Sequence, residues 1–176
     1  NGGSALSSGG LAVSAFNATH FAAAGAGLSW AVADKMLKGK INLTGLCVGM
    51  VVGLVAVTPA AGFVSPTAGL IIGLVGGAAA NFAAYLRGKS QLDDSLDVFA
   101  CHGVGGFVGT VMTGIFASKA INAAGADGGA AQVMIQVKSS LVAGGFAFAA
   151  TFIILKAIDV VIGLRPTTEN EVKGLD

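Results

Sequence analysis

The fold is decided around the segment Thr58-Pro59-Ala60-Ala61-Gly62-Phe63-Val64-Ser65-Pro66, which divides a charge-free run from Ile41 to Leu86 into two halves. The run holds 46 residues without Asp, Glu, Lys or Arg. A helix needs about 20 apolar residues to cross the hydrocarbon core of a membrane, so the run is long enough for two crossings. Two of the three prolines of the chain lie in the dividing segment, where helices can end. The run therefore predicts two membrane helices joined by a turn.

The composition of the whole chain agrees with a membrane protein. Hydrophobic residues make up 54% and charged residues 11%, with a mean hydropathy of +0.80, whereas roughly a quarter of a soluble domain is charged. The net charge of +1 offers no basic patch, so we expect no nucleic-acid partner. Cys47 and Cys101 lie in apolar runs and are interpreted as small buried hydrophobic residues. No zinc-ligand spacing is present, and we expect neither a metal nor a cofactor.

Further charge-free stretches cover residues 1–33, 98–118 and 139–155. With the central run, they predict helices at residues 9–36, 42–61, 67–87, 95–117 and 131–163. Residues 1–8 are expected to be the end of a preceding helix and a turn, and residues 164–176 a cytoplasmic tail. The chain opens on Asn1-Gly2-Gly3-Ser4 without a recognisable signal peptide, which suggests a piece of a longer protein. The prediction is an all-α, polytopic transmembrane helix bundle forming a single domain over residues 1–176.

Positive charges concentrate on alternate loops. Most of the Lys and Arg residues lie in or beside the loop after the first predicted helix, the loop after the third and the tail: Lys35, Lys38, Lys40, Arg87, Lys89, Arg165 and Lys173. The loop at 58–66 has none, and the loop at 118–130 has only Lys119. Because cytoplasmic loops are enriched in Lys and Arg, we expect the C-terminus to be cytoplasmic.

The glycines recur at helical spacing. One series is Gly45, Gly49 and Gly53, a second is Gly69, Gly73 and Gly77, and a third is Gly105 and Gly109. In lipid, small residues four apart allow the backbones of two helices to approach closely. A nucleotide-binding loop would need a preceding strand and a soluble context. The three series therefore predict close helix packing.

His102 is the titratable residue of the charge-free stretch at residues 98–118. Val98 lies one turn earlier on the same face, and Gly105 and Gly106 leave space on the next turn. Ionisable groups at membrane depth are costly and usually face a bundle interior or a water path. We expect an uncharged ring, whose single donor and single acceptor suit a small hydrogen-bonding solute better than a bare metal ion. From the residues alone, a hydrogen-bonded core histidine remains the alternative.

The carboxylates before this helix have two interpretations. Asp93, Asp94 and Asp97 lie near its expected N-terminus, where negative charge interacts favourably with the helix dipole. For Asp93 and Asp94 we expect capping and anchoring alone. Asp97 either does the same, or it orders the inner mouth of a pathway or supports a partner helix.

Other polar residues of the predicted helices are assigned no chemistry. His20 lies within a span between Phe16 and Phe21, and we expect it to be structural and bonded to a neighbouring helix. Lys156 and Asp159 are three residues apart and can pair on the surface of the last helix.

Several segments together resemble the ammonium transporter (Amt/Mep/Rhesus) family. The family's tenth helix is similar to Asp97-Val-Phe-Ala-Cys-His102-Gly-Val-Gly-Gly with Met112-Thr-Gly-Ile-Phe-Ala117, and the end of its sixth helix is similar to Asn1-Gly-Gly-Ser4. Its eighth helix is similar to Gly53-Leu-Val-Ala-Val-Thr-Pro-Ala-Ala-Gly62. The start of its cytoplasmic tail is similar to Gly163-Leu-Arg-Pro with Glu171-Val-Lys-Gly-Leu-Asp176. Family members have eleven helices in two inverted halves around a narrow hydrophobic pore. The resemblance thus implies that this chain is the second half, from the end of helix six to helix eleven.

The resemblance also implies roles for individual residues. The family's pore carries a pair of histidines, of which His102 matches one, and Val98 would line the same pore. Ser4 matches a serine that helps to hold ammonium at the outer vestibule. Asp97 would support the pore. The family places its histidines near mid-membrane, but His102 lies only about 7–8 Å along a helix from Asp97, so we expect Asp97 to be buried and satisfied by neighbours.

The implied function is transport of ammonium or ammonia across the plasma membrane, without catalysis. Family members form homotrimers, and a signal-transduction-type regulator blocks some prokaryotic members at the cytoplasmic face. Alternatives are an ammonium sensor of the same fold, a Rhesus-type gas channel and an unrelated structural membrane protein. A membrane enzyme is disfavoured, because the sequence shows no nucleophile–base pair or metal cluster.

Overall fold

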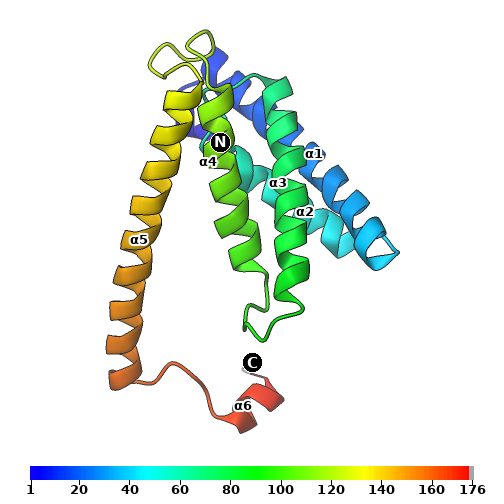
Figure 1. Cartoon of the computed structure of the whole chain (residues 1–176), viewed down its shortest axis with the longest axis vertical. Coiled ribbons are helices and arrows are strands. Elements are labelled where there is room, and N and C mark those ends of the chain that lie inside the picture. Colours follow the sequence, from blue (N-terminus) through cyan, green and yellow to red (C-terminus); the bar gives the residue numbers. More distant parts are fainter. Residues whose placement is uncertain (175–176) are drawn as a thin grey trace. The chain divides into compact units, whose positions relative to one another are not determined.

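The computed structural model describes residues 1–174, and all the regular structure among them is helical (Figure 1). The elements are a short 3₁₀ helix η1 (Gly2–Ala5), then α1 (Gly10–Lys38), α2 (Leu43–Val57), α3 (Pro66–Arg87), a π helix η2 (Phe99–Val104), α4 (Gly105–Phe116), α5 (Ala130–Val161) and α6 (Thr168–Lys173). The all-α prediction is confirmed. Residues 175–176, the end of the predicted tail, lie outside the described residues.

Two compact units divide the chain, Asn1–Val137 and Lys138–Asp176. The first contains η1 to α4 and the start of α5. The second contains the rest of α5 and the helix α6, and in it Lys156 and Asp159 pair at 3.9 Å as predicted. Within residues 1–174, three helical segments are long and apolar enough to cross a membrane: Pro66–Arg87, Phe99–Phe116 and Ala130–Val161.

Two predicted helices differ from the observed ones for local reasons. The helix expected at 42–61 ends at Val57, because the chain continues from there as hydrogen-bonded turns, with the Phe63 N–H donating to Ala60 O at 2.7 Å. Ser65 then caps α3 by accepting from the Ala68 N–H at 3.2 Å. The helix expected at 95–117 has continuous helical structure only from Phe99, because Asp97 takes a left-handed φ of 53° that interrupts a right-handed helix.

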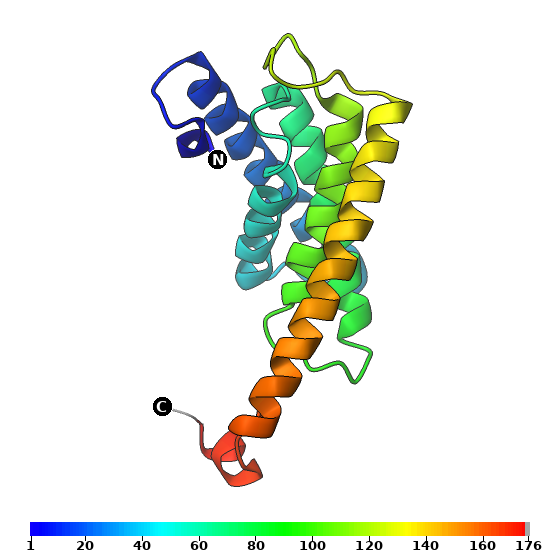
Figure 2. The same cartoon turned by 90° about the vertical axis from the view of Figure 1, so that its left-hand side faces the viewer.

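The glycine series form close helix contacts, as predicted. The helices α2 and α3 lie beside α1 in both views (Figures 1 and 2). A Cβ atom added at Gly49 of α2 would lie 2.5 Å from Trp30 Cβ of α1. One added at Gly69 of α3 would lie 2.6 Å from the carbonyl oxygen of Ala18. These distances leave no room for a methyl group, so the backbones can approach only because glycine stands there.

A buried carboxylate that was not expected from the sequence lies where α1 meets α3. Asp34 of α1 is 1% exposed and accepts a 2.9 Å hydrogen bond from Asn81 Nδ2 of α3. Its Oδ1 atom also pairs with Lys38 Nζ at 2.7 Å. A buried charge is tolerated only with such partners, so this cluster ties α1 to α3.

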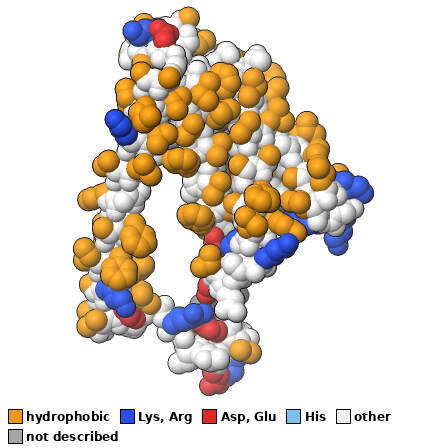
Figure 3. Space-filling model, viewed as in Figure 1, with side chains coloured by type: hydrophobic (Ala, Val, Ile, Leu, Met, Phe, Trp, Pro, Cys, Tyr) orange, Lys and Arg blue, Asp and Glu red, His pale blue; other side chains and the backbone are white. Residues whose placement is uncertain are grey.

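The outside of the first unit is largely apolar. Hydrophobic side chains cover the visible face of α1, α3 and α4 (Figure 3), and Phe16, Leu28, Phe82 and Phe107 are among the exposed ones. Cys101 is buried as predicted, but the prediction for Cys47 is wrong, because Cys47 is exposed on α2. The spacing of the helix turns Cys47 away from the face on which Gly45 and Gly49 meet α1.

Candidate functional site

The loop from α3 to η2 begins the segment that carries His102. The Asp94 carboxylate accepts hydrogen bonds from the backbone N–H groups of Val98 and Phe99, both at 2.9 Å. These two bonds, that of Phe99 first, hold the pKa of Asp94 below its ordinary value, because they stabilise the charged form. Asp94 therefore caps the helical segment, as predicted.

Asp97 does not act as a cap. Its side chain is 28% exposed, and its Oδ1 atom accepts from Arg87 Nη2 at 2.7 Å and from Arg87 Nε at 2.8 Å. Asp97 is therefore satisfied by a neighbour, as expected, but it is only partly buried. The ion pair joins the last turn of α3 to the residue that precedes the helical segment.

His102 lies in the π helix η2, where the sequence analysis predicted a regular α-helix. The Gly105 N–H donates to the carbonyl of Ala100, five residues back. π turns are rare, are usually single turns within an α-helix and often occur at functional sites. No pattern in the sequence signalled this turn.

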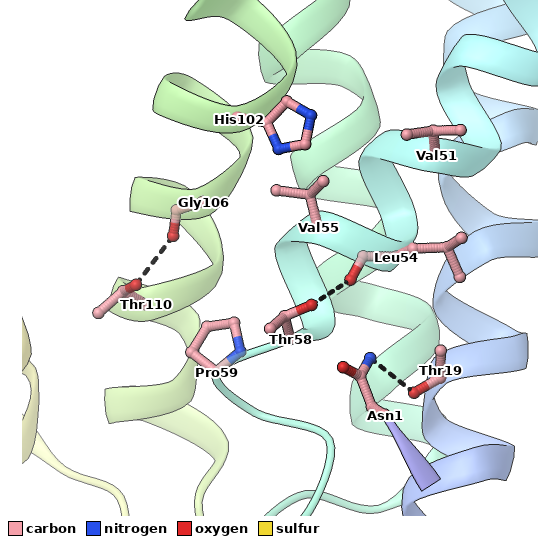
Figure 4. A pocket seen from close by; sticks show the side chains of 10 residues that line it. All are labelled: Asn1, Thr19, Val51, Leu54, Val55, Thr58, Pro59, His102, Gly106 and Thr110. Atoms are coloured by element: carbon pink, nitrogen blue, oxygen red, sulfur yellow. Dashed lines mark hydrogen bonds between the residues drawn. The ribbon is translucent and has the colours of Figure 1, made fainter. Parts of the chain in front are cut away.

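The His102 ring borders a groove of about 600 Å³ in the first unit. Figure 4 shows the ring pointing from η2 toward α2, where Val51 and Val55 lie. The residues lining the groove are Asn1, Thr19, Val51, Leu54, Val55, Thr58, Pro59, His102, Gly106 and Thr110. The His102 ring is therefore not enclosed among other side chains. It borders the groove, and its side chain is exposed in this chain.

The groove's three threonines present mainly acceptors. Each hydroxyl donates its hydrogen to the carbonyl four residues earlier in the chain: Thr19 to Ala15 at 2.7 Å, Thr58 to Leu54 at 2.7 Å and Thr110 to Gly106 at 2.9 Å (Figure 4). A hydroxyl has one hydrogen and two lone pairs, so these groups keep only lone pairs for another partner. Thr19 also accepts from Asn1 Nδ2 at 3.1 Å. The three threonines could not be assigned to the site from the sequence, since an isolated threonine in an apolar run gives no distinctive pattern.

Ser4 lies in a second concavity that adjoins the first. This smaller hollow, of about 240 Å³, is lined by Asn1, Ser4, Ala5, Leu11, Ala15, Thr58, Ala61, Gly62, Phe63 and Asn122. Asn1 and Thr58 line both concavities. The hollow beside Ser4 and the groove beside His102 therefore share two lining residues.

The remaining predicted residues lie elsewhere. Val98 is 52% exposed and is absent from the residues lining the groove, because a π turn alters the alignment that residues four apart have in an α-helix. Of the two glycines expected to make room for His102, Gly106 lines the groove. Gly105 is buried and packs toward Val52 instead.

His20 is outside the groove, as its structural interpretation implies. Its ring lies 6.4 Å from that of Phe16 and 6.5 Å from that of Phe21. No hydrogen bond of the ring is found within residues 1–174, so the expected bond to a neighbouring helix stays a prediction. No group of three or more His, Cys, Asp or Glu side chains suited to a metal ion occurs in the same part of the chain.

The comparison with protein families decides the assignment. Residues 1–176 match the sequence model of the Ammonium Transporter Family. The chain belongs to the ammonium transporter family. This is a family of transporters rather than of enzymes, and the chain is accordingly a multi-pass membrane protein.

Individual relatives agree with the family match. An ammonium transporter of Bacillus subtilis is 41% identical, over 100% of this chain and 45% of the relative. The crystal structure of Saccharomyces cerevisiae Mep2 superposes with a TM-score of 0.88 at 39% identity, over 96% of this chain and 40% of Mep2. A solved structure described as a sensor Amt protein gives a TM-score of 0.89 at 32% identity, over 100% of this chain and 44% of that one. The chain thus spans less than half the length of the ammonium transporters it matches.

Proposed function

We propose that this chain acts as the carboxy-terminal half of an eleven-helix ammonium transporter and conducts ammonia along the groove beside His102. The amino-terminal half would supply the opposite wall of the groove and the second histidine of the pair. The complete transporter would consist of this chain together with that half. The observation that carries the proposal is the His102 ring, open to a mostly apolar groove in a chain of the ammonium transporter family.

The chemistry of the groove favours the neutral molecule over the ion. An intact ammonium ion between apolar walls pays a heavy desolvation penalty, whereas ammonia does not. An uncharged imidazole can donate to the ammonia nitrogen or accept one of its hydrogens. Potassium cannot release a proton and so cannot enter in a neutral form. Selectivity would follow from this difference.

The residues along the groove suggest a direction of passage. Ser4, in the smaller hollow, would receive ammonium at the outer vestibule. Asn1 and Thr58 line both hollows and would carry the solute on to His102. Val98 would line the pore beyond the histidine, and Asp97 would support the helix that carries the histidine.

The family and the charge distribution suggest the membrane location, the oligomeric state and the orientation of the transporter. The complete transporter would lie in the plasma membrane as a homotrimer with the C-terminus of this chain in the cytoplasm. The Lys and Arg residues around the ends of α1 and α3 and in the tail support this orientation. A signal-transduction-type regulator would bind at the same cytoplasmic face.

The test changes His102 in the complete transporter. His102→Ala removes the hydrogen-bonding ring from the groove, and His102→Asp replaces it with a charge. We expect either variant to abolish ammonium uptake or to admit potassium. His20→Ala is the matched control, because it removes an imidazole from α1 outside the groove, and it should keep both uptake and selectivity. Wild-type uptake and wild-type selectivity in His102→Ala would exclude a pore role for this residue.

A sensor is the second candidate, because the structure described as a sensor Amt protein superposes on the whole of this chain. A sensor would bind ammonium with little flux and would need a signalling domain beyond residue 176. Uptake of labelled methylammonium separates the two functions. Electrical current during uptake further separates an electrogenic transporter from a Rhesus-type gas channel.

A further inference from the structure

The direction of the His102 ring depends on two anchors, one on each side of the π turn. On the C-terminal side, Gly109 of α4 meets the backbone of Ala56 so closely that no side chain fits between them. This contact fixes α4 against α2. On the N-terminal side, the ion pair of Asp97 with Arg87 fixes the chain to the end of α3.

Asp97 is also held in an unusual backbone conformation. Its φ of 53° lies in the left-handed region, which residues other than glycine adopt rarely and at a cost. In this conformation the Asp97 carbonyl accepts the Cys101 N–H at 2.9 Å, one residue before His102. The conformation persists only if something outside the local backbone stabilises it. Arg87 supplies two donors to one oxygen of the same residue.

The π turn between the anchors sets which way the ring faces. A π turn contains about one more residue than an α turn, and one residue corresponds to roughly 100° of rotation about a helix axis. If the N-terminal anchor were released, the turn could relax toward α geometry. His102 would then rotate relative to α4 and leave the groove.

We propose that Arg87 is a positioning residue for His102: by pairing with Asp97 it holds residue 97 in the left-handed conformation, maintains the π turn and keeps the imidazole in the groove. This inference rests on the pore role proposed for His102. It assigns Arg87, which lies outside the groove, to the selectivity of the transporter.

The first experiment measures ammonium uptake and ammonium-over-potassium selectivity per transporter molecule in the membrane. Arg87→Gln should lose most uptake or selectivity, whereas Arg87→Lys, which keeps the charge, should retain part of both. Lys89→Gln is the matched control. Lys89 lies two residues after Arg87, just beyond α3, with its Nζ 4.3 Å from the centre of the Tyr85 ring, so the variant removes a positive charge without removing a partner of Asp97. An Arg87→Gln variant with wild-type uptake and selectivity would overturn the proposal.

A second variant separates backbone positioning from simple electrostatics. Glycine adopts a positive φ without the steric cost of a side chain. In an Arg87→Gln background, Asp97→Gly should therefore restore uptake and selectivity toward the wild-type values. Asp97→Ala in the same background removes the same carboxylate but keeps the steric cost of the positive φ, so it should restore much less than Asp97→Gly. If the ion pair acted only through its charges, the two double variants would behave alike, and the proposal would be wrong.

A third readout does not depend on transport. Cys101 lies in the π turn and is 5% exposed. Relaxation of the turn should raise its modification by N-ethylmaleimide by about tenfold in Arg87→Gln, the effect expected from losing a constraint on one strained residue. Mass spectrometry of the Cys101 peptide measures the rate. Unchanged labelling of Cys101 in Arg87→Gln would refute the positioning role of Arg87. If the wild type showed no transport but Arg87→Gln showed raised labelling, only the proposed function would be refuted.

Discussion

The two faces of α2 provide opposite environments. Toward α1, Gly49 and Gly53 leave no space for a methyl group. On the other side, Val51, Leu54 and Val55 border a groove of about 600 Å³. An ionisable group lies on each side of α2, and the two groups differ in burial and in hydrogen-bond partners.

Asp34 belongs to the closed side and His102 to the open one. Asp34 is 1% exposed, and Asn81 and Lys38 satisfy its Oδ1 atom. His102 is exposed to the groove, and no hydrogen bond of its ring is found within residues 1–174. A buried group whose partners belong to the protein stabilises the fold, whereas an unpartnered group on a cavity remains available to a solute. The contrast separates a polar residue satisfied within the bundle from one left open to a cavity.

The largest effect is expected from adding a methyl group at a closed helix contact, and the same addition beside the groove serves as the comparison. Gly109→Ala would force a Cβ against the Ala56 backbone, and overpacking of this kind costs about 1–3 kcal/mol of stability or more. Gly106→Ala, three residues earlier, would place its Cβ 3.9 Å from Val55 Cγ1, an ordinary contact. Thermal unfolding of the purified complete transporter should show a lower midpoint for Gly109→Ala only. Gly106→Ala should instead reduce uptake by narrowing the groove, and equal midpoints for the two variants would contradict the contrast.

A smaller effect is expected when the buried carboxylate is removed. Asp34→Ala leaves the buried Asn81 amide without its partner, which should cost about 1–3 kcal/mol. Lys35→Ala is the matched control, because the Lys35 side chain is exposed and donates to the Gly39 carbonyl, so its loss removes a positive charge from the same helix end without leaving a buried charge unpaired. Thermal unfolding measures both. Uptake per folded molecule should be unchanged in Asp34→Ala, the reverse of the result expected for His102→Ala, and a transport defect without a stability defect would place Asp34 on the functional side.

The smallest effect concerns the cap at the entrance to the His102 segment. Because hydrogen bonds lower the pKa of Asp94 below its ordinary value of 3.8, its stabilising contribution is complete above pH 3.8 and is lost as the pH falls through the lowered pKa. The unfolding midpoint of Asp94→Asn should therefore lie slightly below that of the wild type at neutral pH. The difference should shrink on acidification below pH 3.8. A difference that stays constant or grows at low pH would exclude the carboxylate cap.

Much of this arrangement could be predicted from local patterns. Charge-free runs located all five longer helices to within a few residues, because the length of an apolar run reflects the thickness of the membrane. Glycines four residues apart identified the faces on which helices pack, because only the absence of a Cβ permits such an approach. His102 stood out because an ionisable residue is expensive in an apolar helix.

Two of the missed features depend on contacts between different helices. Asp34 and Asn81 are separated by 47 positions and meet only when α3 packs on α1. The left-handed Asp97 and the π turn depend on Arg87, which belongs to another helix. The start of α4 was therefore predicted as a regular helix.

The sequence by itself determined the positions of the longer helices, the packing faces and the presence of an ionisable residue, His102, in an apolar helix, because each follows from hydrophobicity or residue size along one segment. Only the tertiary structure decided which polar groups are satisfied and which face the groove. A side chain's hydrogen bonds and free space are set by neighbours that other helices bring to it. Asp34 and His102 are both single polar residues in apolar helices, and their surroundings alone make one structural and leave the other open to a solute.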